Sequence, residues 1–128
     1  MKEIVYTDQA PAPIGPYSQA TVHGNQVFTS GQIAINPQSG ALILDSIEAE
    51  TRQVMENLKA VLAAAKCEMS DVLKCSIFIS DMNQFQRINA VYAEYFDESQ
   101  APARETVQVA VLPKNVNIEV SAIAIRRG

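Results

Sequence analysis

Hydrophobic and polar residues alternate in the first third of the chain, and this alternation predicts short strands. It is found at residues 3–6, 17–22, 26–30, 32–35 and 41–44. His23-Gly24-Asn25 separates two of these segments, and its glycine and asparagine tolerate the positive φ of a tight hairpin. We therefore expect a meander of antiparallel strands in this region.

Two later segments have the spacing of amphipathic helices. In the first, Asp45 with Glu48 three residues later is typical of a helix start, and apolar residues then recur every three or four positions as far as Ala65. In the second, Asp81 precedes an apolar stripe that runs from Phe85 to Phe96.

Three further strands complete the pattern. They are predicted at residues 72–80, 105–111 and 116–126, with a turn at Pro113-Lys114-Asn115 before the last. In the first of them we expect Leu73, Cys75, Ile77 and Ile79 on one face, and Val72 and Phe78 on the other.

The order of these elements favours one α+β domain, residues 1–128, in which two helices pack on one face of a mixed sheet. The strands also carry Val, Ile and Ala on the face that the helices leave uncovered. An exposed apolar sheet face is typical of an association surface, so we expect a homo-oligomer.

Composition excludes several classes of function. Hydrophobic residues make up 48% of the 128 residues, which is typical of a globular protein. A net charge of −4 with scattered basic residues argues against nucleic-acid binding and against anionic membranes. No apolar run approaches the ~18 residues of a membrane span, and the N-terminal segment does not resemble a secretory signal.

Histidine and cysteine offer little catalytic chemistry. Cys67 and Cys75 are not part of a CxxC motif, and His23 is the single histidine, so neither a metal site nor a disulfide framework is indicated. Free thiols fit a cytoplasmic protein. A nucleophile activated by histidine is not favoured either, because His23 lies in the predicted hairpin turn.

The segments around Arg104 and Glu119 carry the strongest chemical signal. They lie on two strands that we expect to be neighbours, where the arginine can bind a carboxylate through two N–H groups and the glutamate can orient a water. Alternation places Arg104 and Thr106 on one face and Glu105 on the other. A structural ion pair is the alternative explanation.

Two polar residues at apolar positions are further candidates. Tyr17 follows Gly15-Pro16 and can aim its hydroxyl into a cleft, although packing alone would also explain it. Asn89 interrupts the stripe of the second helix, where a buried amide needs hydrogen-bond partners whether its role is structural or functional.

Several segments together resemble the RidA (YjgF) family in order and spacing. They are Ala12-Pro13-Ile14-Gly15-Pro16-Tyr17-Ser18-Gln19, Thr29-Ser30-Gly31-Gln32, Asn89 with Val91-Tyr92, Pro102-Ala103-Arg104 and Ile118-Glu119-Val120. The resemblance implies a chorismate-mutase-like α+β fold, a homotrimer with clefts between neighbouring subunits, and enamine/imine deaminase activity without a cofactor. Such an enzyme hydrolyses 2-imino acids, or their enamine tautomers, to 2-oxo acids and ammonia.

The resemblance also assigns roles to individual residues. It implies that Arg104 binds the substrate carboxylate, that Glu119 positions the attacking water, and that Tyr17 and Asn89 line the pocket. Ser30 and Gly31 fall where the family's backbone carbonyl meets the substrate nitrogen.

The chain departs from the family pattern at two neighbouring positions. Thr106 stands where the family often has cysteine, and it can still donate through its hydroxyl and its backbone N–H. Glu105 stands where the family usually has a small residue, and we expect it to face away from the substrate.

Two other functions stay open at this point. One is a non-catalytic trimer that binds 2-oxo or 2-imino acids in the same cleft. The other is an RNA-cleaving or chaperone-like role, which would need a basic groove or a large apolar patch.

Overall fold

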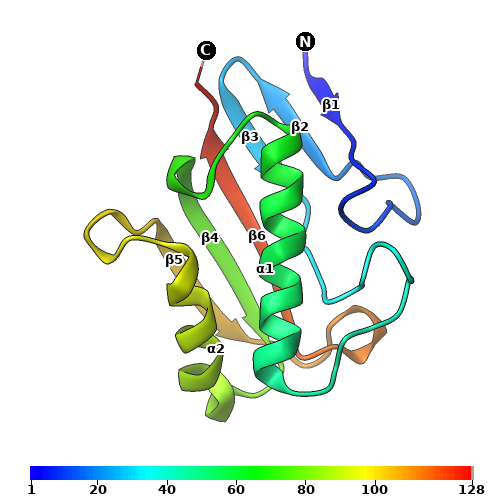
Figure 1. Ribbon diagram of the computed structural model, residues 1–128, viewed down its shortest axis with the longest axis vertical. Coiled ribbons are helices and arrows are strands. Elements are labelled where there is room, and N and C mark those ends of the chain that lie inside the picture. Colours follow the sequence, from blue (N-terminus) through cyan, green and yellow to red (C-terminus); the bar gives the residue numbers. More distant parts are fainter. Residues whose placement is uncertain (128) are drawn as a thin grey trace.

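A six-stranded sheet forms one layer of the computed structural model, and two α-helices form the other (Figure 1). The structure describes residues 1–127. The strand order is β1-β2-β3-β6-β4-β5, and every neighbouring pair is antiparallel except β4 and β5, which are parallel. The strands are β1 (Glu3–Val5), β2 (Ala20–His23), β3 (Gln26–Thr29), β4 (Val72–Ile79), β5 (Ala103–Gln108) and β6 (Ile118–Ile125). The predicted α+β arrangement, with two helices on one face of a mixed sheet, is confirmed.

The core lies between the sheet and helices α1 (Ile47–Ala64) and α2 (Phe85–Tyr92). Strand β6 runs through the middle of the sheet, and every second side chain from Ile118 to Ala124 is buried beneath α1. The apolar stripe of α1 packs against it. Each fully buried Val, Leu or Ile side chain in this layer contributes about 1.5–3 kcal/mol, so the layer holds α1 over the centre of the sheet.

Both helices begin close to the predicted positions, with different details. The N-cap of α1 is Ser46, whose hydroxyl oxygen accepts a hydrogen bond from the backbone N–H of Ala49 at 3.0 Å. The predicted cap, Asp45, is therefore wrong by one residue. Asp81 caps a 3₁₀ turn, Met82–Gln84, which leads directly into α2.

The predicted strands at 32–35 and 41–44 are wrong. Only two isolated bridges form there, one between Gln32 and Val120 and one between Ile35 and Leu42. The side-chain amide of Asn57 on α1 donates instead to the carbonyls of Ile33 and Ile35, which removes them from a regular ladder. The alternation at residues 32–35 reflects the burial of Gln32 and Ala34, and strand pairing is limited to the two bridges.

Other strand limits also differ from the prediction. Strand β2 starts at Ala20, three residues after the predicted start at Tyr17. Strand β5 covers residues 103–108 where 105–111 was expected, because its parallel partner in β4 ends at Ile79.

A bulge changes the faces of β4. The register with β6 shifts between Val72 and Lys74, so one extra residue is accommodated at Leu73. As a result Val72 is buried with Cys75, whereas Leu73 is 52% exposed. The prediction that Leu73 shares a face with Cys75 is therefore wrong.

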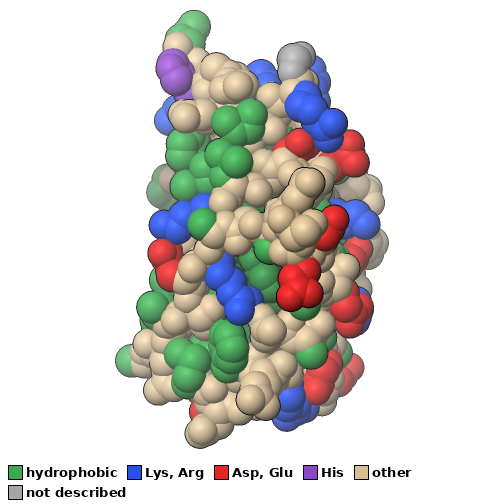
Figure 2. Space-filling model, turned by 90° about the vertical axis from the view of Figure 1, so that its left-hand side faces the viewer, with side chains coloured by type: hydrophobic (Ala, Val, Ile, Leu, Met, Phe, Trp, Pro, Cys, Tyr) green, Lys and Arg blue, Asp and Glu red, His purple; other side chains and the backbone are tan. Residues whose placement is uncertain are grey.

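The face of the sheet opposite the helices is uncovered and partly apolar. Ile4, Phe28 and Val107 are exposed on it, with more than two fifths of each side chain open to solvent. Figure 2 views the molecule from the β5 and α2 edge. Hydrophobic side chains are more frequent there on the left, which is the uncovered side of the sheet, and acidic side chains gather on the right, helical side.

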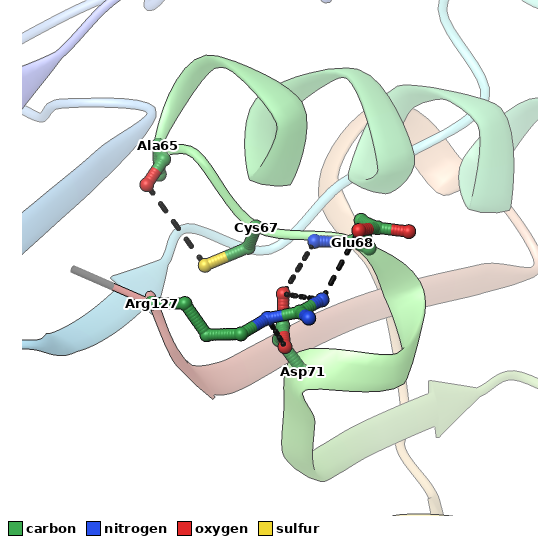
Figure 3. Close-up of polar contacts among 5 residues, drawn as sticks. All are labelled: Ala65, Cys67, Glu68, Asp71 and Arg127. Carbon is green, nitrogen blue, oxygen red and sulfur yellow. Dashed lines mark hydrogen bonds and ion pairs between the residues drawn. The ribbon is translucent and has the colours of Figure 1, made fainter.

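Arg127 ties the end of the described chain to the segment between α1 and β4 (Figure 3). Its Nε lies 3.0 Å from Oδ1 of Asp71, and its Nη2 lies 3.0 Å from Oε2 of Glu68. Beside them, the buried thiol of Cys67 points to the carbonyl oxygen of Ala65. Cys67 and Cys75 are both free.

Candidate active site

Glu119 lies in a cavity of about 470 Å³, a size suited to a small organic ligand. Tyr17, Ser30 and Gly31 line the same cavity, together with apolar side chains that include Ile14 and Ile33. The structure thus brings together four of the residues that the sequence indicated, from the N-terminal loop, the end of β3 and the start of β6.

Gly31 permits the close approach of Glu119. A Cβ atom added to Gly31 would lie 2.0 Å from Oε2 of Glu119 and 2.7 Å from its carboxyl carbon. The carboxylate therefore packs directly against the backbone of Gly31. Burial raises the pKa of Glu119, because the ionised form loses hydration in this cavity.

The loop that carries Tyr17 is held by backbone geometry and by Ser30. Gly15 adopts φ +126°, a conformation that other residues rarely take, and its carbonyl accepts a hydrogen bond from the N–H of Tyr17 at 2.9 Å. The hydroxyl of Ser30 donates to the carbonyl of Ser18 at 2.5 Å. Ser30 therefore holds the loop beside the cavity twice, through its hydroxyl and through its backbone N–H, which donates to the carbonyl of Gln19 at 2.9 Å.

Three buried polar side chains position the cavity and were missed from the sequence. Gln19 accepts from the N–H of Thr7 and donates to the carbonyls of Thr7 and Pro11, which fixes the proline-rich loop. Asn57 holds the carbonyls on either side of Ala34, as described above.

The third of these side chains is Glu50, which is 1% exposed. Its carboxylate accepts from the backbone N–H and the side-chain amide of Asn117, both at 2.7 Å, two residues before Glu119. Glu50 and Asn57 occupy positions within the apolar stripe of α1. The sequence could have indicated their role there, because a polar residue at a buried helical position needs a hydrogen-bond partner.

Arg104 lies elsewhere, on edge strand β5 beside α2. Its Nη1 donates to Oδ1 of Asn89 at 2.5 Å, and its guanidinium carbon lies 5.0 Å from the ring centre of Tyr92 and 5.4 Å from that of Phe85. Thr106 lines a hollow of about 630 Å³ with Arg104, and its hydroxyl is buried without a hydrogen-bond partner among residues 1–127.

Arg104 and Glu119 do not share a face of the sheet. Arg104 is paired with Cys75 across β5 and β4, whereas Glu119 is paired with Phe78 across β6 and β4. Cys75 and Phe78 are three residues apart on one strand, so their side chains point in opposite directions. Strand β4 also separates β5 from β6, and the expectation that the two residues lie on neighbouring strands is therefore wrong.

Glu105 points away from Arg104, as the alternation predicted. Its carboxylate accepts from the hydroxyl of Ser76 at 2.7 Å and pairs with Lys74 at 3.2 Å, on the uncovered face. These contacts hold the pKa of Glu105 below its usual range. The charge of Glu105 is thus directed away from any anion bound by Arg104.

Comparison with known proteins decides the family. A family model described as Endoribonuclease L-PSP matches residues 7–126. A RutC family protein of Pyrococcus horikoshii is 52% identical over 126 residues, which cover 98% of this chain and 99% of the relative. The 2-iminobutanoate/2-iminopropanoate deaminase of Escherichia coli is 45% identical over 129 residues, covering 99% of this chain and 100% of the relative. The chain belongs to the RidA (YjgF) family.

A solved RidA-family structure has the same fold. The crystal structure of Escherichia coli TdcF with bound serine superposes with a TM-score of 0.91 at 46% identity, and the match covers 98% of this chain and 99% of TdcF. Among residues 1–127, no three His, Cys, Asp or Glu side chains lie together as metal ligands would. Within the same residues, no helix is both long enough and apolar enough to cross a bilayer.

Proposed function

We propose that this chain hydrolyses 2-imino acids and their enamine tautomers to 2-oxo acids and ammonia. The relative named 2-iminobutanoate/2-iminopropanoate deaminase, at 45% identity over nearly the whole of both chains, supports this reaction class. The described side chains also fit it, because they supply a cation for a carboxylate and a glutamate beside a cavity of small-molecule size.

The observation that carries the proposal is the separation of Arg104 from Glu119 on opposite faces of the sheet. One copy of the chain holds two halves of a site that do not meet. The apolar uncovered face offers a surface for self-association, and a cleft between two copies can combine Arg104 of one with Glu119 of the other. The proposed assembly is a homotrimer of chorismate-mutase-like subunits with three such clefts.

In this site Arg104 binds the substrate carboxylate through two N–H groups, and Thr106 adds a donor from its hydroxyl or its backbone. Tyr17 and a backbone carbonyl of Ser30 or Gly31 hold the substrate nitrogen. These contacts place the imine carbon next to the carboxylate of Glu119.

Glu119 orients a water toward the imine carbon and accepts one of its protons. The water oxygen bonds to that carbon as the C=N double bond becomes single, and the nitrogen takes up a proton. The nitrogen thus receives the proton that Glu119 took from the water. The remaining hydroxyl proton then passes to the nitrogen, the C–N bond breaks with its electron pair on nitrogen, ammonia leaves, and the carbon–oxygen double bond of the 2-oxo acid forms. The reaction consumes one water and needs no cofactor, and correct orientation supplies much of the acceleration.

The direct test uses freshly generated 2-iminobutanoate and follows the release of ammonia or 2-oxobutanoate. We expect the parent protein to accelerate release and Arg104→Ala to lose nearly all acceleration. Arg87→Ala is the matched control, because Arg87 is also a surface arginine on the α2 side of the molecule and is paired with Glu48.

Failure of the parent protein to accelerate release would contradict the proposal. Saturable binding of 2-oxobutanoate without turnover would then favour the non-catalytic trimer. RNA binding that weakens steeply as salt rises would favour the RNA-directed role named by the family model.

A further inference from the structure

Arg104 differs from every other arginine of the chain in the partners that it contacts. The other four each pair with a carboxylate at 3.0 Å or less: Arg52 with Glu94, Arg87 with Glu48, Arg126 with Glu3, and Arg127 with Glu68 and Asp71. Within residues 1–127 Arg104 has no carboxylate partner. It contacts the amide of Asn89 and the rings of Tyr92 and Phe85.

These partners hold a guanidinium without neutralising it. Aromatic rings attract a cation through their faces, so they leave the N–H groups in the guanidinium plane free to donate. Asn89 accepts from one of the five N–H groups that an arginine carries. A carboxylate partner would instead compete with an anionic ligand for the same fork of donors.

Tyr92 is itself fixed in place. Its side chain is 6% exposed, and its ring packs against that of Phe96 with the ring centres 4.9 Å apart. Its hydroxyl is buried next to the thiol of Cys75, which is a weak hydrogen-bond partner, and it has no oxygen or nitrogen partner among the described residues. Burial in the core and the contact with Phe96 therefore fix the ring of Tyr92, and they place it 5.0 Å from the guanidinium carbon of Arg104.

We infer that Tyr92 and Phe85 are positioning residues, whose rings hold the Arg104 guanidinium in place, with its donors unneutralised, to bind the carboxylate of the substrate. This inference rests on the proposed function, in which Arg104 contacts that carboxylate. It adds that carboxylate affinity depends on two aromatic rings that touch no reacting atom.

The test compares Tyr92→Leu with Tyr92→Phe. Leucine removes the aromatic face, whereas phenylalanine keeps the ring and removes only the hydroxyl. For Tyr92→Leu we expect KM for 2-iminobutanoate and Kd for 2-oxobutanoate to rise on the order of tenfold, with kcat much less affected. Tyr92→Phe should retain parental KM and Kd. Phe85→Leu, at a less buried ring, provides the same test if Tyr92→Leu does not fold.

Two further measurements separate positioning from general damage. The uncharged 2-oxobutanamide should bind the parent and Tyr92→Leu proteins equally, because it lacks the carboxylate. In an Arg104→Met background, Tyr92→Leu should cause no additional loss of 2-oxobutanoate binding.

The outcomes distinguish this inference from the proposed function. A parent protein without turnover or 2-oxobutanoate binding would overturn the proposed function itself. An active parent whose Tyr92→Leu and Phe85→Leu variants keep parental KM, or lose affinity equally for the amide, would overturn the inference alone.

Discussion

Gly31 is the residue on which the geometry of the Glu119 cavity depends most closely. Gly31→Ala should lower kcat/KM on the order of 100-fold, because a displacement of about 1 Å at a reacting group is enough for such a loss. The added methyl would collide with the Glu119 carboxylate. Steady-state kinetics with 2-iminobutanoate checks this.

Gly24→Ala is the matched control. Gly24 lies in the β2–β3 hairpin at φ +62° with open space around the added methyl, so alanine strains the backbone but touches no site residue. Its kcat/KM should stay near the parental value while its melting temperature falls. Parental kcat/KM in Gly31→Ala would show that Glu119 is not fixed by this contact.

Glu119 should also determine the acidic limit of activity. Burial raises its pKa, so the carboxylate takes up a proton at a higher pH than an ordinary glutamate near 4.5. Because the ionised form orients the water, kcat/KM of the parent should fall as pH is lowered, before that ordinary range is reached. A pH profile without this fall, in a protein that remains folded, would exclude Glu119 as the base.

Glu119→Gln separates activity from stability. A raised pKa means that the folded state binds the Glu119 proton more tightly than the unfolded state does. The protonated side chain therefore stabilises the fold at low pH, and this stabilisation is lost as pH rises through the pKa of the folded state. At neutral pH the glutamine variant should therefore unfold at the same temperature as the parent or higher, although its activity is lost.

At the scale of elements, α1 positions the segments that line the Glu119 cavity, because its side chains hydrogen-bond to them. Glu50→Ala should lower the free energy of unfolding by about 3 kcal/mol, because two part-buried donors of Asn117 lose their charged acceptor. Glu56→Ala, on the exposed face of the same helix, should cost less than about 1 kcal/mol. Urea denaturation measures both, and equal losses would contradict a special role for Glu50.

The pair Arg87–Glu48 links α2 to α1 and gives a pH-dependent contribution to stability. Its two hydrogen bonds, at 2.7 and 2.8 Å, lower the pKa of Glu48 from 4.5 to about 2. This stabilisation is complete above 4.5 and is lost as pH falls through about 2. The parent should unfold at a slightly higher urea concentration than Glu48→Gln at neutral pH, and the difference should be small because Arg87 and Glu48 are both exposed. This difference should disappear as pH falls from 4.5 to about 2. A difference independent of pH would contradict the prediction.

The sequence predicted the elements better than it predicted their contacts. Helical periodicity located α1 and α2 because apolar residues recur at helical spacing in both, and alternation correctly separated Arg104 from Glu105. It failed at residues 32–35, where Asn57 binds the backbone carbonyls. It also failed at Leu73, because a bulge leaves no local mark on alternation.

Strand order was the other part that local patterns did not reveal. Nothing in the spacing of Arg104 and Glu119 shows that β4 is inserted between their strands, because that order follows from how the whole sheet packs beneath the helices. The residues of the candidate site were found from chemistry and family resemblance. Their division into two separate groups required the fold.

At the scale of the whole molecule, this division is the main feature to explain. Glu119 with Tyr17 and Gly31 faces one cavity, and Arg104 with Asn89 lies at the β5 edge on the helical face. A site built from two copies explains both this separation and the apolar uncovered sheet face. It also predicts that monomers are inactive although every site residue is present.

The most direct measurement of this central claim mixes two inactive variants, Arg104→Ala and Glu119→Ala, under conditions that exchange subunits. If each cleft takes Arg104 from one copy and Glu119 from its neighbour, random mixing restores both residues in about a quarter of the clefts. We therefore predict recovery of about a quarter of parental imine hydrolysis. Mixed assemblies that form and stay inactive would contradict a site shared between subunits.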